Sequence, residues 1–431
     1  MSWSSYDRGI RRTVDWKLVI CYLVLVLFGW LNIYASIHTA DTATIFEWGS
    51  RSGKQFIWMM ISFGVAALVL FVINPKLWEV ISSPSYLLVF ILLIAVIFVG
   101  GEVKGSKSWF VMGPVSFQPA EISKITTALT LAMIMSQQGF SMARLRNKAI
   151  AAAVVLLPMV VIVAEKETGS ALVYLAFLFA LYREGLSGWI FFVGFMAVLL
   201  FILTMTCPIY VPFIVLGAVV LAYYIGARMT FSRTLAMKRR TRLICLASLL
   251  AGSLMIFSSN FIFEKVLQDH QRKRVEVLLG LKDDPMGIGY NVNQSKIAIG
   301  SGGFAGKGFL HGTQTAYGFV PEQSTDFIFC TVGEEWGFLG CLFVICLYVF
   351  LIYRIVHDAN ESRETFTRIY GYCVAGCFFM HMFINIGMTI GLMPVIGIPL
   401  PFMSYGGSSL LGFTLMLFIF IALNRQEKRY F

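Results

Sequence analysis

Apolar runs about as long as a bilayer-spanning helix recur along the whole chain and constrain its fold more than any other feature. A helix needs roughly 20 apolar residues to cross the hydrocarbon core of a membrane. Only 13% of the residues are charged, whereas a soluble domain carries about a quarter. We therefore expect an all-α fold, a polytopic membrane helix bundle in which residues 1–431 form a single integral membrane domain. Twelve spans are predicted, at approximately 18–36, 55–73, 84–100, 119–136, 148–164, 169–182, 188–206, 209–226, 243–261, 327–353, 367–390 and 402–424.

The distribution of basic residues predicts the orientation of these spans. Lysine and arginine gather in the N-terminal leader, in the turns at 137–148 and 227–242, and in the C-terminal tail. With an even number of spans, all four segments fall on the cytoplasmic side, which is where basic loops concentrate. Both termini are then cytoplasmic, and residues 262–326 become a large extracytoplasmic loop. The net charge of +11 is explained in this way, and we expect no nucleic-acid partner.

Polar side chains within the apolar runs gather near the predicted outer side. Such groups are costly in a bilayer and usually mark a cavity, a relay or a substrate path. In "FQPAEISK", Glu121 and Lys124 are three residues apart, so they share one face of a helix and can pair. Two interpretations stay open for this pair, which is either an internal ion pair or the polar wall of a substrate cavity.

Asp326 stands directly before the apolar stretch "FIFCTV". It can cap the next helix, which is a common use of aspartate, or it can carry chemistry; composition alone does not decide. The glycine-rich stretch "GYNVNQSKIAIGSGGFAGKGFLHGTQ" precedes it, and glycines allow backbone N–H groups to approach a ligand closely. The basic side chains of Arg272, Arg274 and Lys307 near this stretch would suit a phosphate group.

Several kinds of site are not predicted. The chain has neither a Walker A loop nor a Rossmann glycine fingerprint, so a soluble nucleotide is not expected as an energy source or sugar donor. No set of histidine, cysteine and carboxylate residues has clear metal-ligand spacing, and no metal ligands are predicted. The eight cysteines lie in or beside apolar runs, and we interpret them as reduced core residues.

The motifs "FQPAEISK", "VPEQSTDFIFCTVGEEWGFLG" and "NIGMTIGLMPVIGIPLPFMSYGGSS", with the glycine-rich stretch, closely resemble the SEDS family of RodA, FtsW and SpoVE. These proteins are bacterial glycosyltransferases that polymerise peptidoglycan from lipid II. The resemblance runs from about residue 18 to residue 424, and "KGFLHGTQ" is more similar to the RodA, cell-elongation branch than to the FtsW, division branch. Family members usually have ten spans, so residues 188–226 are interpreted as an inserted helix pair, and 262–326 as the periplasmic loop that carries the catalytic motif.

The resemblance also implies roles for individual residues. Asp326 corresponds to the essential catalytic aspartate, and Glu121 and Lys124 to residues that line a central cavity in the family. The family's "QPDLGTA" is "EKETGSA" here, with Glu167 in the place of the aspartate. The predicted substrate-binding residues are Glu121, Lys124, Arg272, Arg274, Lys307, Gln314, Glu322 and Ser404.

The implied reaction transfers a glycan chain from undecaprenyl diphosphate to the 4-hydroxyl of an acceptor sugar with inversion. Asp326 is the expected general base, and Lys124, Arg272, Arg274 and Lys307 are the expected donors to the diphosphate, together with a divalent cation (Mg²⁺ or Mn²⁺) as the one cofactor considered. The expected partners are a class B penicillin-binding protein (a transpeptidase) and other elongation-complex proteins of the bacterial inner membrane. Three alternatives remain, namely a flippase for lipid-linked precursors, a division-type FtsW-like polymerase and a non-catalytic scaffold.

Overall fold

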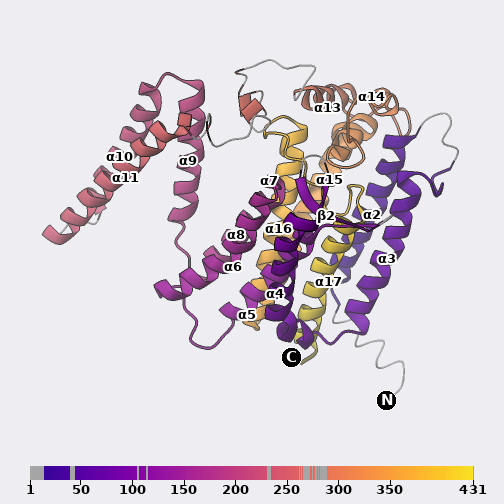
Figure 1. Ribbon diagram of the computed structural model, residues 1–431, viewed down its shortest axis with the longest axis horizontal. Coiled ribbons are helices and arrows are strands. Elements are labelled where there is room, and N and C mark those ends of the chain that lie inside the picture. Colours follow the sequence, from indigo (N-terminus) through magenta and orange to yellow (C-terminus); the bar gives the residue numbers. More distant parts are fainter. Residues whose placement is uncertain are drawn as a thin grey trace. The chain divides into compact units, whose positions relative to one another are not determined.

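The computed structural model of the chain describes residues 14–38, 44–103, 106–112, 115–230, 234–261 and 289–430, together with residues 263, 265, 272, 273, 275, 276, 279 and 281. Its backbone contacts divide the chain into two compact units, the first made of residues 1–186 with 291–431 and the second of residues 187–290. Figure 1 colours both units by their position in the sequence, and the single integral membrane domain stays a prediction.

The first unit is a bundle of helices. Its N-terminal part contains α2 (Trp16–Ile37), α3 (Arg51–Phe71), α4 (Lys76–Val99), α5 (Pro119–Met135), α6 (Leu145–Ala164), α7 (Thr168–Val173), the 3₁₀ turn η1 (Tyr174–Ala176) and α8 (Phe177–Arg183). Its C-terminal part contains α13 (Tyr290–Ser301), α14 (Thr313–Ala316), α15 (Ile328–Glu361), α16 (Thr365–Thr389) and α17 (Gly407–Tyr430). Figure 1 shows α13 and α14 at the end of the helices opposite to the C-terminus.

The second unit contains α9 (Trp189–Thr206), α10 (Tyr210–Thr230) and α11 (Leu235–Phe261). A small apolar core, with Leu200, Leu216 and Ile256 at its centre, joins the three helices. Most other apolar side chains of these helices are exposed, as expected for helices that lipid surrounds. The predicted inserted pair, 188–226, corresponds to α9 and most of α10.

The prediction of an all-α membrane bundle is confirmed. Among the described residues, ten helices are long and apolar enough to cross a membrane. Two of the twelve expected spans are helical but shorter, since α5 has 17 residues and the run from Thr168 to Arg183 belongs to the shorter apolar helices. The count of twelve spans therefore stays a prediction.

A small antiparallel sheet, which was not predicted, connects α4 to α5. Its strands are β1 (Gly101–Val103), β2 (Ser106–Met112) and β3 (Val115–Phe117), in the order β1-β2-β3. Aromatic and β-branched residues such as Trp109, Phe110 and Val111 favour a strand in this position. The connection is too short for another span, so its backbone groups pair with one another in the sheet.

The core of the first unit lies around α16 and α17, which are buried along most of their length. Tyr22 of α2 makes edge-to-face contacts with Phe402 and Phe418. Its hydroxyl hydrogen-bonds to Thr414 of α17 at 3.1 Å. Aromatic pairs of this kind fill the interior without leaving a buried hydroxyl unpaired.

The glycine-rich stretch before Asp326 packs against a kink in α15, where Gly337 has φ +64° and ψ −158°. At the kink the backbone N–H of Phe338 donates to Gly303 O at 2.9 Å, and Lys307 N–H donates to Glu334 O at 3.0 Å. A Cβ on Gly306 would lie 2.1 Å from Glu335 O. These glycines thus allow two backbones to approach each other, and the hydrogen bonds expected to serve a ligand are made within the protein.

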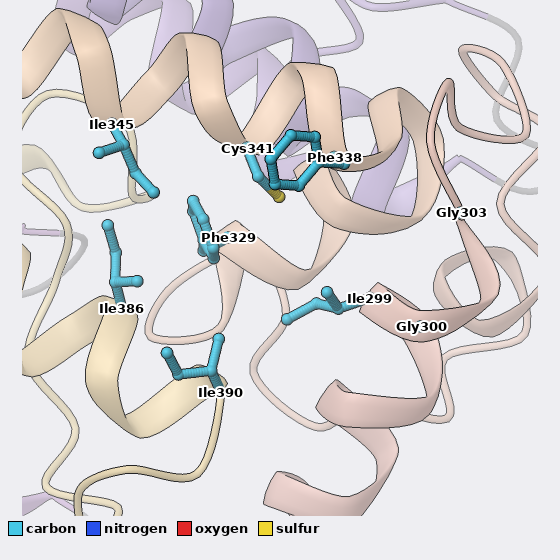
Figure 2. A pocket seen from close by; sticks show the side chains of 9 residues that line it. All are labelled: Ile299, Gly300, Gly303, Phe329, Phe338, Cys341, Ile345, Ile386 and Ile390. Carbon is cyan, nitrogen blue, oxygen red and sulfur yellow. The ribbon is translucent and has the colours of Figure 1, made fainter.

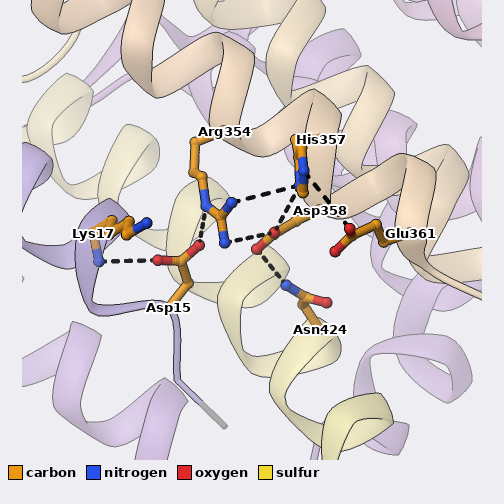
Figure 3. A network of polar contacts seen from close by, with 7 residues as sticks. All are labelled: Asp15, Lys17, Arg354, His357, Asp358, Glu361 and Asn424. Carbon is orange, nitrogen blue, oxygen red and sulfur yellow. Dashed lines mark hydrogen bonds and ion pairs between the residues drawn. The ribbon is translucent and has the colours of Figure 1, made fainter. Parts of the chain in front are cut away.

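A polar network holds three helices together near the start of α2 (Figure 3). Arg354 of α15 donates to Asp15 Oδ2 at 2.5 Å and lies 3.2 Å from Asp358 Oδ1. Asn424 of α17 donates to Asp358 Oδ2 at 2.7 Å. Asp358 is fully buried, so its charge is balanced by contacts within the bundle.

Within the described residues, one group has the composition of a metal site, and it is formed by His357, Asp358 and Glu361. Asp358 already pairs with Arg354 and accepts from Asn424. A cation at this place would compete with the guanidinium, and we assign the group to the network of Figure 3.

Candidate active site

Asp326 lies in the turn that leads into α15, and its side chain is half-buried. The helix begins at Ile328, its N-cap residue is Phe327, and no side chain caps it there. The simplest structural explanation of Asp326, which is that it occupies the N-cap position, is therefore wrong. The carboxylate is instead directed toward Gly397, because a Cβ on that glycine would lie 3.2 Å from Asp326 Oδ2.

The backbone of the aspartate turn is held by α16 and by the segment 394–406 that precedes α17. Asn385 of α16 donates to Asp326 O at 2.8 Å and to Ile398 O at 2.7 Å. The hydroxyl of Ser404 donates to Thr325 O at 2.6 Å and accepts from the backbone N–H of Leu400. Ser404, predicted to bind substrate, thus has its hydroxyl engaged in holding the residue next to Asp326.

Gly397 offers a direct test of how strictly the carboxylate must be placed. Its φ is +76°, so Gly397→Ala brings both backbone strain and a methyl group into contact with Asp326. Gly139→Ala is the matched control, because Gly139 has φ +80° and a Cβ added there would meet open space. We expect similar losses of stability for the two variants, but a fall in catalytic activity of about 100-fold only for Gly397→Ala, since a misplacement of about 1 Å costs that much. Equal activities of the two variants would contradict this placement.

The Glu121–Lys124 pair is buried within the bundle, with 4% and 1% of the two side chains exposed. The ammonium group of Lys124 lies 2.9 Å and 3.0 Å from the two carboxylate oxygens of Glu121 and 2.9 Å from His381 Nε2. Since an ammonium only donates, Nε2 accepts, and the Nδ1–H of His381 donates to Pro399 O at 3.1 Å. The pair thus connects α5, through α16, to the segment that contacts Asp326, and a direct contact with substrate stays a prediction.

Lys307 and Gln314 meet at a second buried carboxylate, Glu334 of α15. Lys307 Nζ donates to Glu334 Oε1 at 2.7 Å. The backbone N–H groups of Gln314 and Thr315 donate to the two oxygens of Glu334 at 2.8 Å each. Lys307, predicted to neutralise a diphosphate, is therefore already paired with a carboxylate that is fully buried.

The remaining predicted residues fall in different places. Glu322 is half-buried at the start of the aspartate turn, where its Oε2 accepts from Thr325 at 3.0 Å. Arg272 belongs to the second unit and lies 3.7 Å from Glu276. Arg274 lies outside the described residues.

Glu167, in the turn after α6, accepts hydrogen bonds at Oε1 from Ser108 at 2.6 Å and Ser106 at 3.0 Å. Its neighbour Glu165 is buried, and neither of its carboxylate oxygens has a hydrogen-bond partner among the residues that the structure describes. Burial, reinforced by the charge of Glu167, raises the pKa of Glu165 to about 8. The folded protein therefore favours the protonated form of this acid.

This shift makes stability depend on pH with a definite sign. Because the folded-state pKa of Glu165 lies above its ordinary value of 4.5, its contribution to stability is present below about pH 4.5 and is lost as the pH rises to about 8. We expect Glu165→Gln to gain thermal stability relative to the native chain as the pH rises through this window. The measurement is the melting temperature of both proteins at several pH values across this window. A constant difference between the two melting temperatures would contradict the raised pKa of Glu165.

An apolar groove of about 380 Å³ opens beside the aspartate turn, between α13, α15 and α16. Figure 2 shows Phe329 and Ile386 directed into it, together with Ile299 and Ile390. Phe329 is three residues from Asp326, and Ile386 is next to Asn385, which holds the backbone of the aspartate. The groove and the carboxylate therefore share the same structural elements.

The family model described as cell cycle protein, which covers FtsW, RodA and SpoVE, matches residues 15–215 and 194–429. Together the two matches span nearly the whole chain. The chain belongs to this family. The two matched stretches of the FtsW/RodA/SpoVE model overlap at 194–215, within the segment predicted to be an insertion.

Curated relatives in the FtsW/RodA/SpoVE family are named as peptidoglycan glycosyltransferases. The chain is 35% identical to peptidoglycan glycosyltransferase MrdB of Escherichia coli (strain K12) over 353 residues, 81% of this chain and 80% of the relative. It is 31% identical to peptidoglycan glycosyltransferase RodA of Treponema pallidum over 427 residues, 94% of this chain and 95% of the relative. A probable peptidoglycan glycosyltransferase FtsW of Trichlorobacter lovleyi is 26% identical over 93% of this chain and 91% of the relative.

Solved structures show that the fold is that of the family. A chain from a structure described as "Structural coordination of polymerization and crosslinking by a peptidoglycan synthase complex" has a TM-score of 0.69 at 24% identity, and the match covers 97% of this chain and 98% of that one. The rod shape determining protein RodA of Thermus thermophilus has a TM-score of 0.60 at 23% identity, with 96% and 97% covered.

Three residues of the site were not predicted from the sequence, namely Arg51, Glu334 and Gly397. The signal for Glu334 was present, since a charged residue inside an apolar span is a site candidate by itself. Arg51 gave no signal, because its hydrogen-bond partner Ser324 lies 273 positions away in the sequence and only the folded structure brings them together.

Proposed function

We propose that this chain is a peptidoglycan glycosyltransferase that polymerises lipid II into glycan strands during cell elongation. Membership of a family whose curated relatives are named for this activity supports the proposal. The higher identity to MrdB and RodA than to FtsW supports the elongation role. The observation that carries the proposal is a half-buried carboxylate, Asp326, at the end of a helix it does not cap.

The reaction needs one inverting displacement. The acceptor 4-hydroxyl oxygen bonds to the anomeric carbon of the donor, and the bond from this carbon to the diphosphate breaks, with its electron pair leaving on the diphosphate oxygen. The hydroxyl proton passes to Asp326, which is placed by Asn385 and the segment 394–406. A positioned general base of this kind contributes about 10²–10⁴-fold to a rate.

The leaving diphosphate needs positive charge nearby. A divalent cation, Mg²⁺ or Mn²⁺, stays part of the proposal, and it would take oxygen ligands as these ions prefer. The diphosphate itself would supply most of these ligands, because around Asp326 the described residues form no group of three histidine or carboxylate ligands. A chelator added to the polymerisation reaction tests this requirement.

The groove of Figure 2 suits part of the polyprenyl chain of the lipid-linked donor. An isoprenoid is purely hydrocarbon, and burying hydrocarbon stabilises by about 0.8 kcal/mol per methylene. A chain in this groove would place the diphosphate and the sugar close to the aspartate turn. The groove therefore supports a lipid-linked substrate over a soluble sugar nucleotide.

The proposal includes a location and a partner. We place the chain in the bacterial inner membrane with both termini in the cytoplasm, because this orientation puts its four basic segments inside. Asp326 then faces the periplasm, where the glycan strand is made. A class B penicillin-binding protein is the proposed partner, since the similar chain belongs to a complex described by its polymerisation and crosslinking.

The decisive experiment supplies fluorescent lipid II to the purified protein, with and without the partner, and separates the products by gel electrophoresis. The proposal predicts a ladder of glycan polymers that depends on the native chain. A parallel assay in liposomes follows the transbilayer movement of the same lipid. Movement without polymer would identify a flippase, and neither polymer nor movement would indicate a scaffold.

A further inference from the structure

Arg51, the first residue of α3, reaches the aspartate turn from another part of the chain. Its Nη1 donates to the hydroxyl of Ser324 at 2.6 Å, and Ser324 is two residues before Asp326. Its guanidinium carbon lies 5.9 Å from the ring centre of Tyr405. The backbone N–H of Tyr405 donates to Ser324 O at 2.8 Å, so all three residues are held to one turn.

The guanidinium of Arg51 keeps most of its hydrogen-bonding capacity. Arginine has five N–H donors, and the described contacts use one of them, for Ser324. The side chain is exposed, and it forms no ion pair with a carboxylate among the described residues. Its positive charge is therefore not balanced from within the described protein.

Three of the four cations that the sequence predicts for the diphosphate already have a partner, and the fourth, Arg274, lies outside the described residues. Lys124 is 1% exposed and bonded to Glu121 and His381. Lys307 is paired with Glu334. Arg272 Nε lies 3.7 Å from Glu276 Oε1. Of the described candidates, Arg51 is the one with free donors beside the aspartate turn.

We propose that Arg51, with the hydroxyl of Ser324 as its anchor, binds the diphosphate of the lipid-linked donor. This inference rests on the proposed function and names a subsite of the same site. The Cα atoms of Ser324 and Asp326, which are two residues apart, are separated by at most about 7 Å. A sugar attached to a diphosphate at Arg51 can therefore contact Asp326. The planar guanidinium fits a phosphate with two parallel hydrogen bonds, which a lysine cannot reproduce.

Arg51 stabilises the transition state more than the bound substrate. When the bond to the anomeric carbon breaks, negative charge grows on the diphosphate oxygen, and a fixed cation acts most strongly on growing charge. The ring of Tyr405 below the guanidinium and the bond to Ser324 hold the cation in place before the substrate arrives. The proton of the acceptor hydroxyl thus goes to Asp326, and the electron pair of the broken bond goes to the diphosphate that Arg51 binds.

The test compares Arg51→Gln and Arg51→Lys with Lys54→Gln, which removes one positive charge from an exposed lysine one turn along α3. Binding of undecaprenyl diphosphate to full-length protein in the Asp326→Asn background is measured by the shift in melting temperature, so that no turnover is needed. Vesicles of phosphatidylglycerol and soluble pyrophosphate are the other two probes, and polymerisation rates are measured in the chain with Asp326 intact.

We expect Arg51→Gln to weaken binding of undecaprenyl diphosphate at least tenfold and Arg51→Lys to recover only part of it, whereas Lys54→Gln binds like the native chain. Ser324→Ala keeps the guanidinium, so it should weaken binding less than Arg51→Gln. Equal binding by Arg51→Gln and Lys54→Gln would overturn the proposal, as would an equal Arg51-dependent response to phosphatidylglycerol. A native chain that binds the diphosphate through Arg51 but makes no polymer would instead contradict the proposed function.

Discussion

Replacing Asp326 by asparagine is expected to lower the rate of glycan polymerisation by about 10²–10⁴-fold, which is the usual contribution of a general base. Asparagine has nearly the same size, and the backbone oxygen of residue 326 still accepts from Asn385. The fold should therefore persist, and the loss should appear in kcat rather than in KM. Asp326→Glu keeps the carboxylate but moves it by one methylene, and an intermediate rate is expected.

The measurement is the initial rate of polymer formation from labelled lipid II, with the melting temperature as a check of folding. Glu361→Gln is the control, because this exposed carboxylate lies at the far end of the same helix. A rate for Asp326→Asn within a few-fold of the control would remove the aspartate from the chemistry.

Replacing Lys124 by methionine is expected to destabilise the bundle strongly. It leaves Glu121, of which 4% is exposed, without its cation and deprives His381 Nε2 of its donor. Breaking a buried ion pair from one side costs about 3–5 kcal/mol, whereas replacing both partners by apolar or neutral groups is often nearly neutral. The double variant Glu121→Gln with Lys124→Met should therefore fold much better than the single one.

The double variant also separates the two interpretations of this pair. Thermal unfolding gives the stability of the single and double variants, and polymerisation gives their activity. A double variant that is stable and active identifies an internal ion pair, whereas a stable but inactive one assigns Lys124 to the substrate. A single variant as stable as the native chain would contradict the buried geometry itself.

Features that local chemistry determines could be predicted from the sequence. Hydrophobic length predicted the membrane helices, and a charge before an apolar run marked Asp326 and the pair of Glu121 and Lys124. The sheet between α4 and α5 was missed because it is only a few residues long and forms between spans. Short strands leave a weak pattern beside a strong helical one.

Features that depend on distant pairings could not be predicted. Gly397 is one glycine among many until the structure shows that a Cβ there would lie 3.2 Å from Asp326 Oδ2. The glycine-rich stretch suggested a loop around a ligand, but its backbone pairs with the kink in α15 at Gly337. Lys307 suggested a phosphate site, but a carboxylate 27 residues away in the sequence already binds it.

The most direct test of the account is a structure of the Asp326→Asn variant with lipid II bound in both the donor and the acceptor position. The account predicts the acceptor 4-hydroxyl within about 2.6–3.2 Å of the side chain at position 326, which is the reach of a general base. It also predicts the donor diphosphate at the guanidinium of Arg51. Saccharide bound with its hydroxyl far from residue 326, and with no room beside that side chain, would contradict the account.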